Sequence, residues 1–138
     1  MKKLIVSSVL SLALTGCPEF TMDPLKDRVY IKNNSPHSID TYFAYGGNGG
    51  TAYPDTTLPI NDYTVKDIKS GTQYPFDVNS LESTINRLPA DTLSIYIFHT
   101  DTLKKYSWQE VRDGYKVLKR YDLSLEDLKR MNYTITYP

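Results

Sequence analysis

The chain has 138 residues, and its 16 basic and 16 acidic side chains give a formal net charge of zero. This balance argues against a nucleic-acid-binding protein and against a polybasic patch that would attract a membrane surface. The length allows one domain but hardly two. Twelve tyrosines, all beyond residue 29, favour strands over helices.

The first residues have the pattern of a secretory signal. Lys2 and Lys3 precede an apolar run, residues 4–14, that is too short to span a bilayer as a helix. The run ends in Leu-Thr-Gly-Cys, residues 14–17, which resembles the lipobox of bacterial lipoproteins. In that family the cysteine thiol takes a lipid and the leader is cut off before the cysteine. The resemblance implies a lipid-anchored protein.

We therefore expect residues 1–16 to be a signal peptide and Cys17 to anchor the protein to the bacterial cell envelope, at the outer membrane. Residues 17–26 contain two prolines and no periodic pattern and predict a tether. Residues 27–138 predict a single globular, β-rich domain. The alternatives are an ordinary secreted protein and an inert, buried thiol. Because an exported chain with one unpaired cysteine is unusual, lipidation is favoured.

The domain begins with two segments of alternating apolar and polar residues. Residues 28–45 contain both segments, separated by Asn-Asn-Ser-Pro at residues 33–36, and this pattern predicts a β-hairpin. The side chains expected to face the core are Val29, Ile31, Ile39, Thr41 and Phe43.

The middle of the chain alternates between turn-rich and apolar segments. Residues 46–62, which begin with Gly-Gly-Asn-Gly-Gly, predict a long irregular loop. Residues 63–78 predict two short strands with a turn at residues 70–71, and residues 80–87 predict one or two helical turns. Residues 93–98 form the densest apolar run, which is typical of a central strand buried on both faces.

The C-terminal third carries two helix-capping signals. Ser107 with Glu110, and Ser124 with Asp127, have the spacing in which a serine and an acidic residue cap a helix reciprocally. A strand within residues 115–123 is expected between the two helices. The side chains expected to face inward are Trp108, Val111 and Tyr115 in the first helix, and Leu125, Leu128 and Met131 in the second.

Six to eight strands, ending with residues 133–137, and two or three short connecting helices predict a mostly-β sandwich. A two-layer α+β sheet is the alternative. Residues 91–138, together with the lipobox and the segment "VYIKNNS" at residues 29–35, resemble small lipoproteins of uncharacterised function from gut anaerobic bacteria. The resemblance supports the envelope location and the fold, and it implies neither an activity nor catalytic residues.

The search for catalytic patterns gives little. His99 and Asp101 follow the densest strand, and His37 lies in the predicted hairpin turn. Two histidines with the only cysteine committed to lipid are too few for an ordinary zinc site, so we expect no metal and no cofactor. We interpret His99 as the end of a strand and Asp101 as a cap. Nucleophile-elbow, zincin and phosphate-loop motifs do not occur in the sequence.

The favoured function is a non-catalytic binding module displayed on the envelope, with a glycan or a protein as partner and no nucleic acid. A structural or accessory outer-membrane lipoprotein and a small hydrolase are the alternatives. In the predicted hairpin, Tyr30 and Tyr42 would form an exposed platform, which Tyr45 and Tyr53 could extend. The competing interpretation is that a helix covers this face and that the same tyrosines are core residues.

Overall fold

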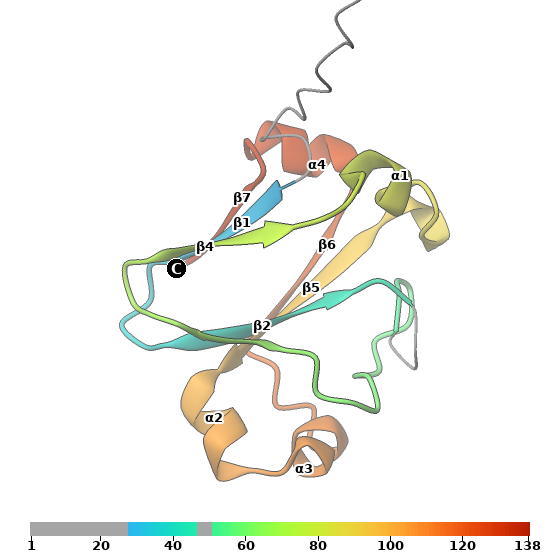
Figure 1. Cartoon of the computed structure of the whole chain (residues 1–138). Helices are drawn as coiled ribbons and strands as arrows, with labels where there is room; N and C mark the ends of the chain where they lie inside the picture. Colours follow the sequence, from blue (N-terminus) through green and yellow to red (C-terminus); the bar gives the residue numbers. More distant parts are fainter. Residues whose placement is uncertain (1–27, 47–50) are drawn as a thin grey trace, which may run out of the picture.

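Seven strands form two sheets in the computed structural model, which describes residues 28–46 and 51–138 (Figure 1). The smaller sheet has the order β4 (Gln73–Asp77), β1 (Arg28–Asn33), β7 (Thr134–Tyr137). The larger sheet has the order β3 (Val65–Ile68), β2 (Ile39–Ala44), β5 (Leu93–His99), β6 (Lys119–Leu123). The sheets pack face to face, so the predicted mostly-β fold with short helices is confirmed.

The predicted hairpin of β1 and β2 is wrong, because the two strands belong to different sheets. β1 pairs with β4 and, in parallel, with β7, whereas β2 pairs with β3 and β5. The expected turn instead crosses from one sheet to the other. Val29 and Ile31 do face the core, as do Ile39 and Phe43, but from opposite sides of it.

Asn33 holds this crossing in place. Its side-chain amide donates to the carbonyl oxygens of His37 (2.7 Å) and Ile68 (2.9 Å), and its Oδ1 accepts from the amide and hydroxyl of Ser35. The second crossing, from β3 to β4, lies beside the first, since Gly71 donates its amide to the Asn33 carbonyl (2.8 Å). One buried side chain therefore joins both connections between the sheets.

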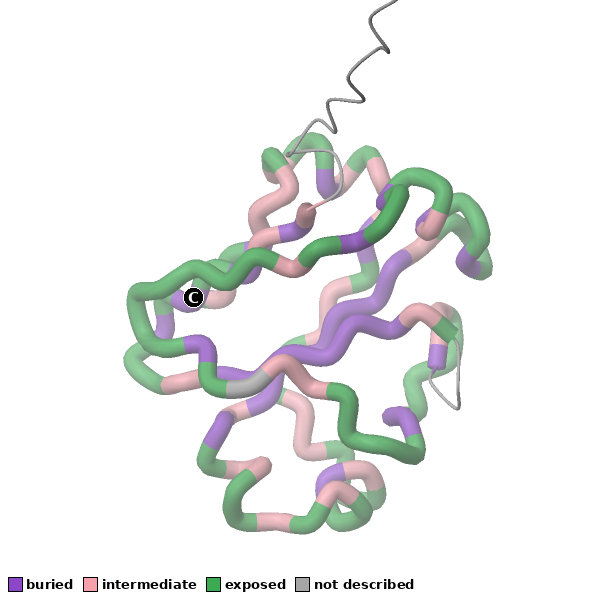
Figure 2. Tube along the Cα trace, viewed as in Figure 1, coloured by how far each residue is buried: buried purple, intermediate pink, exposed green. Residues whose placement is uncertain are grey.

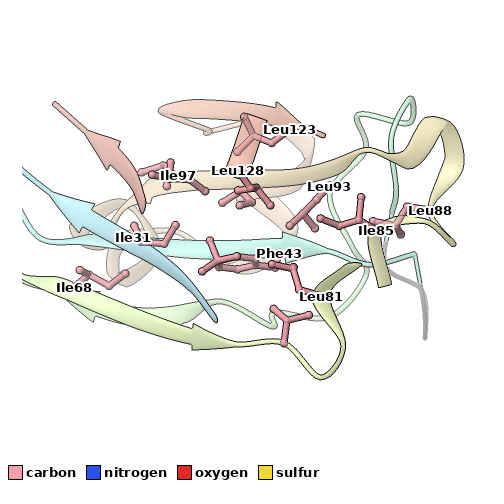
Figure 3. Packing of buried hydrophobic residues seen from close by; sticks show 14 of the residues in the cluster. Ile31, Phe43, Ile68, Leu81, Ile85, Leu88, Leu93, Ile97, Leu123 and Leu128 are labelled. Carbon is pink, nitrogen blue, oxygen red and sulfur yellow. The ribbon is translucent and has the colours of Figure 1, made fainter. Parts of the chain in front are cut away.

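The main core lies between the two sheets, and two helices close one end of it (Figures 2 and 3). The strands contribute Val29, Ile31, Ile39, Phe43, Leu93, Ile95, Ile97, Leu123 and Ile135. Leu81 and Ile85 of α1 (Leu81–Ile85) and Leu128 of α4 (Leu125–Arg130) close the core at one end of the sandwich. Burial of each such aliphatic side chain stabilises the fold by about 1.5–3 kcal/mol.

A second apolar cluster covers the outer face of the larger sheet. Tyr42, Tyr96 and Phe98 on this face pack beneath Leu58 and Val111. β5 is consequently buried on both faces, as its dense apolar sequence predicted. Two helices on this side, α2 (Thr100–Lys105) and α3 (Trp108–Asp113), contribute to the cover (Figure 1).

Both predicted capping boxes are present. Ser107 and Glu110 begin α3, and Ser124 and Asp127 begin α4 in the same reciprocal way. The helix α2 was not predicted, because its N-cap is His99, whose ring nitrogen Nδ1 accepts from the Asp101 amide at 3.2 Å. His99 ends β5 as predicted and also caps the helix, whereas Asp101, predicted as the cap, lies in the first turn. A short 3-10 turn, Pro89–Asp91, completes the described helical segments.

Trp108 packs as predicted, whereas Tyr115 does not. The Trp108 ring lies edge-on against Phe98 with centroids 5.7 Å apart, and its Nε1 donates to the Pro59 carbonyl at 2.9 Å. Tyr115 lies beyond the end of α3 and is 45% exposed. The contact with Pro59 fastens the residue 51–62 loop to α3.

Candidate functional site

A pocket of about 520 Å³ is lined by residues at the ends of β2 and β4 and in or beside α1. Figure 1 shows α1 and α4 at one end of the sandwich. We call this pocket the Tyr45 pocket. Its size falls in the range of small-ligand sites, which is a few hundred to about 1,000 Å³. The lining residues are Tyr45, Phe76, Asp77, Val78, Asn79, Thr84, Arg87 and Leu88.

Aromatic rings form one wall of the Tyr45 pocket. Phe43 and Phe76 stack across the sandwich, and the Tyr45 ring lies 6.1 Å from the Phe76 ring at an interplanar angle of 20°. Burial raises the pKa of the Tyr45 phenol well above its usual range. Its hydroxyl oxygen is enclosed and has no hydrogen-bond partner among the described residues. The wall is thus apolar, and the Tyr45 hydroxyl is buried behind it.

Polar groups line part of the remaining wall of the Tyr45 pocket, beside Val78 and Leu88. Asp77 forms an ion pair with Arg28, with 2.5 Å between Oδ1 and Nε, so its charge is balanced at the pocket's edge. Thr84 donates its hydroxyl to the Asn79 carbonyl at 3.1 Å and thereby holds the connection from β4 to α1 against the helix. Hydrogen-bonding groups beside an aromatic wall suit a ligand that is apolar on one face and hydroxylated at its edges.

A second, larger pocket adjoins the first on the far side of Arg87. This α1–α4 pocket has a volume of about 690 Å³, and Arg87 lines both pockets. The other lining residues are Ser80, Glu82, Ser83, Asn86, Leu125, Lys129 and Tyr133. Most of these lining residues have polar side chains, and they include two cations and one carboxylate.

The four tyrosines predicted as one platform lie in different places, so that platform is wrong. Tyr30 is partly exposed on the outer face of the smaller sheet, opposite Pro75. Tyr42 is only 4% exposed on the outer face of the larger sheet, beneath the second apolar cluster. The whole sandwich separates these two residues because β1 and β2 are not neighbours. For Tyr42, the competing interpretation as a core residue is confirmed.

Tyr53, the fourth of these residues, belongs to a surface centred on Arg120. The Arg120 guanidinium lies 5.9 Å from the Tyr53 ring centroid and 5.3 Å from that of Tyr96. It also donates to Asp122 (2.7 Å) and Ser94 (3.2 Å). These partners occupy the arginine and fix it against β5, so the contacts explain Arg120 as a stabilising group.

A third, smaller pocket of about 280 Å³ lies at the opposite end of the larger sheet, beside buried Asp40. The Asp40 carboxylate accepts from the Thr100 hydroxyl (2.5 Å) and from the Asp67 amide (2.9 Å). Asp67 has a positive φ of 63° in an irregular stretch of the pairing between β2 and β3. These contacts give Asp40 a structural role in holding that irregularity.

The two histidines come together, although the sequence places them far apart. The rings of His37 and His99 have centroids 4.9 Å apart, and Asp101 lies 4.0 Å from His99 Nδ1. Within residues 28–46 and 51–138, no three histidine, cysteine or acidic side chains are arranged to hold a metal ion. Because His99 Nδ1 accepts a hydrogen bond from the Asp101 amide, helix capping explains the position of His99 beside Asp101.

Several pocket residues were missed by sequence reasoning. Tyr45 was among the predicted binding residues, but Phe76, Asp77 and Arg87 were not. Each of these three looks unremarkable in the sequence, since Phe76 and Asp77 end a short edge strand and Arg87 follows a helical turn. Only the crossing of the chain between sheets brings them to Tyr45. Cys17, the predicted lipidation site, lies outside the described residues.

Comparisons with protein-family models, curated proteins and solved structures gave no match. In the part of the chain that the structure describes, the helices are too short and too polar for any of them to cross a membrane. Function must therefore be argued from the geometry of the pockets and from the sequence signals.

Proposed function

We propose that this protein is a lipid-anchored component of the bacterial outer membrane whose domain binds a glycan without catalysing a reaction. The N-terminal lipobox pattern supports the anchor, with Cys17 as the lipidated residue. Two or three acyl chains on one residue hold a protein stably at a membrane, whereas one chain alone is marginal.

The Tyr45 pocket is the observation that carries the glycan proposal. Sugars present apolar C–H faces that stack on aromatic rings and hydroxyls that hydrogen-bond at their edges. The Tyr45 and Phe76 rings supply the stacking face, and Asn79, Thr84 and Arg87 supply polar groups around it. For Tyr45 the ring is the part suited to this role, since its hydroxyl is enclosed.

The same pocket supports binding over hydrolysis. Most glycosidases use two carboxylates on either side of the bond that they cleave. Among the described lining residues of the Tyr45 pocket, Asp77 is the one carboxylate, and it is already paired with Arg28. A small hydrolase is therefore the less favoured function.

A panel of immobilised neutral and acidic oligosaccharides tests the proposal with the full chain purified in detergent. We expect at least one glycan to bind, with affinity lost in Tyr45→Leu, which removes the ring, and kept in Tyr45→Phe, which retains it. Tyr74→Leu is the matched control, because Tyr74 is 40% exposed on β4 and does not line the pocket. If no glycan binds, or if Tyr45→Leu binds as the native chain does, the proposal fails.

A protein partner is the second candidate, supported by exposed apolar side chains away from the pocket. Ile60 is 67% exposed, and Tyr63 is 52% exposed in the same loop. Such residues are enriched at protein interfaces when they gather in a patch. Cross-linking on intact cells would favour this function if Ile60→Ser abolished a specific adduct that Tyr45→Leu left unchanged.

A further inference from the structure

The α1–α4 pocket is lined by two cations, Arg87 and Lys129. Neither Arg87 nor Lys129 forms an ion pair with a residue that the structure describes. Elsewhere in the described chain, ion pairs engage Arg28, Lys69, Lys104, Arg120 and Arg130. With Glu82 as the one carboxylate beside these two cations, the pocket lining carries a net positive charge, which favours an anionic ligand group.

The local geometry keeps Arg87 ready for such a group. Its Nε donates to the Ser83 carbonyl at 3.1 Å, which ties the side chain to the preceding helical turn. The terminal nitrogens of the guanidinium have no hydrogen-bond partner among the described residues. A guanidinium fork binds carboxylate or phosphate oxygens in a bidentate manner, and its planar shape loses little freedom when it does so.

Lys129 lines the same pocket from α4, whereas Arg87 comes from the segment just after α1, so the two cations belong to separate parts of the chain. Glu82 also lines the pocket and makes no ion pair with a described residue. Its carboxylate is an acceptor for ligand hydroxyls, while Ser83 and Asn86 add further hydrogen-bonding groups. A ligand with both hydroxyls and an anionic group would satisfy this mixture, whereas a purely neutral sugar would leave both cations unpaired.

We propose that the adjoining pockets bind an acidic oligosaccharide, with a sugar ring on Tyr45 and a carboxylate or phosphate between Arg87 and Lys129. Because Arg87 lines both pockets, one chain of linked sugars can pass its side chain and occupy the two. This inference rests on the proposed glycan-binding function and specifies the class of glycan.

Two matched pairs of probes test the inference by calorimetric titration of the full chain. Trigalacturonate is compared with its methyl ester, which keeps the sugar and removes the charge. A phosphorylated pentamannose is compared with its dephosphorylated form. We expect the charged member of at least one pair to bind about tenfold or more tightly, as one charge-assisted hydrogen bond would give. The pair that shows the difference identifies carboxylate or phosphate as the anionic group.

The variants Arg87→Gln and Lys129→Gln should each remove most of this preference for charge, and higher salt should reduce it in the native chain. Lys32→Gln is the matched control, because Lys32 is exposed on β1 and lines neither pocket. Equal binding of charged and neutral members, in a protein that does bind glycans through Tyr45, overturns the inference and leaves the proposed function standing. Absence of binding to every glycan in the panel overturns both.

Discussion

The rings of Phe43 and Phe76 stack face to face across the sandwich, with centroids 3.7 Å apart and planes within 5° of parallel. Phe43 belongs to β2 in the larger sheet, and Phe76 belongs to β4 in the smaller one. Tyr45 follows Phe43 by two residues and lies on the same side of its strand, so the contact that joins the sheets also positions the pocket wall.

Phe76→Ala should lower the free energy of unfolding by about 2–3 kcal/mol, somewhat less than the 3–5 kcal/mol typical of a fully buried phenylalanine, because Phe76 is partly exposed. Urea denaturation of the native and variant chains measures this loss. The matched control on the same strand is Tyr74→Ala, which should change stability by no more than about 0.5 kcal/mol. Equal effects of the two substitutions would show that the stacked pair does not join the sheets.

Asn33→Ala should destabilise the protein by about 3 kcal/mol, because several buried polar groups lose their partner at once. The variant leaves the carbonyls of His37 and Ile68 without the Asn33 amide, and Ser35 without its acceptor. The control is Asn34→Ala, since Asn34 is exposed and its contact with Tyr137 is made by the backbone amide. Equal melting temperatures for the two variants would contradict the proposed role of Asn33.

The stability of the protein should depend on pH through Asp127, which caps α4. Hydrogen bonds from the Ser124 hydroxyl and amide, and then from Arg130, lower the pKa of Asp127 from 3.8 to about 2. A carboxylate with a lowered pKa in the folded state contributes stability above the unfolded value, and this contribution is lost as pH falls from 3.8 to about 2.

The variant Asp127→Asn should therefore be less stable than the native chain at neutral pH, with the difference shrinking through this acidic window. Denaturation at a series of pH values measures the difference. Glu126→Gln is the control, because Glu126 is an exposed neighbour on the same helix. A difference between Asp127→Asn and the native chain that stays constant down to pH 2 would show that the capping carboxylate is not responsible.

Metabolic labelling with a fatty acid tests the anchor. If Cys17 is the lipidated residue, as proposed, the native chain should incorporate the label and lose residues 1–16. Cys17→Ser should show neither change. Retention of the label by this variant would contradict lipidation at Cys17.

Features whose signal lies within a few neighbouring residues were predictable. The two serine–acid pairs at Ser107 and Ser124 cap their helices as their spacing indicated, and the apolar run of β5 is buried on both faces. Each signal depends on contacts within one helical turn or on the composition of one strand. The strand count and the mostly-β class followed from such local signals.

Strand partners and the pocket were not predictable in the same way. Alternation shows which face of a strand is buried but not which strand lies beside it, so Val29 and Ile31 fit a hairpin and a sandwich equally well. Asn33 favours the sandwich over the hairpin, because its side chain donates hydrogen bonds to groups in both connections between the sheets. Tyr45 and Arg87 line one pocket only because the chain crosses to the smaller sheet before β4. No pattern of neighbouring residues in the sequence indicates this crossing.

The central claim is that a glycan binds in the Tyr45 pocket, and methyl NMR of the full chain tests it most directly. Val78 and Leu88 line the pocket, whereas Leu58 and Val111 cover the outer face of the larger sheet, away from the pocket. On titration with the glycan that binds most tightly in the panel, we expect the chemical shifts of the Val78 and Leu88 methyl groups to change and those of Leu58 and Val111 to stay the same. Chemical-shift changes confined to Leu58 and Val111, or no changes at all, would contradict glycan binding in the Tyr45 pocket.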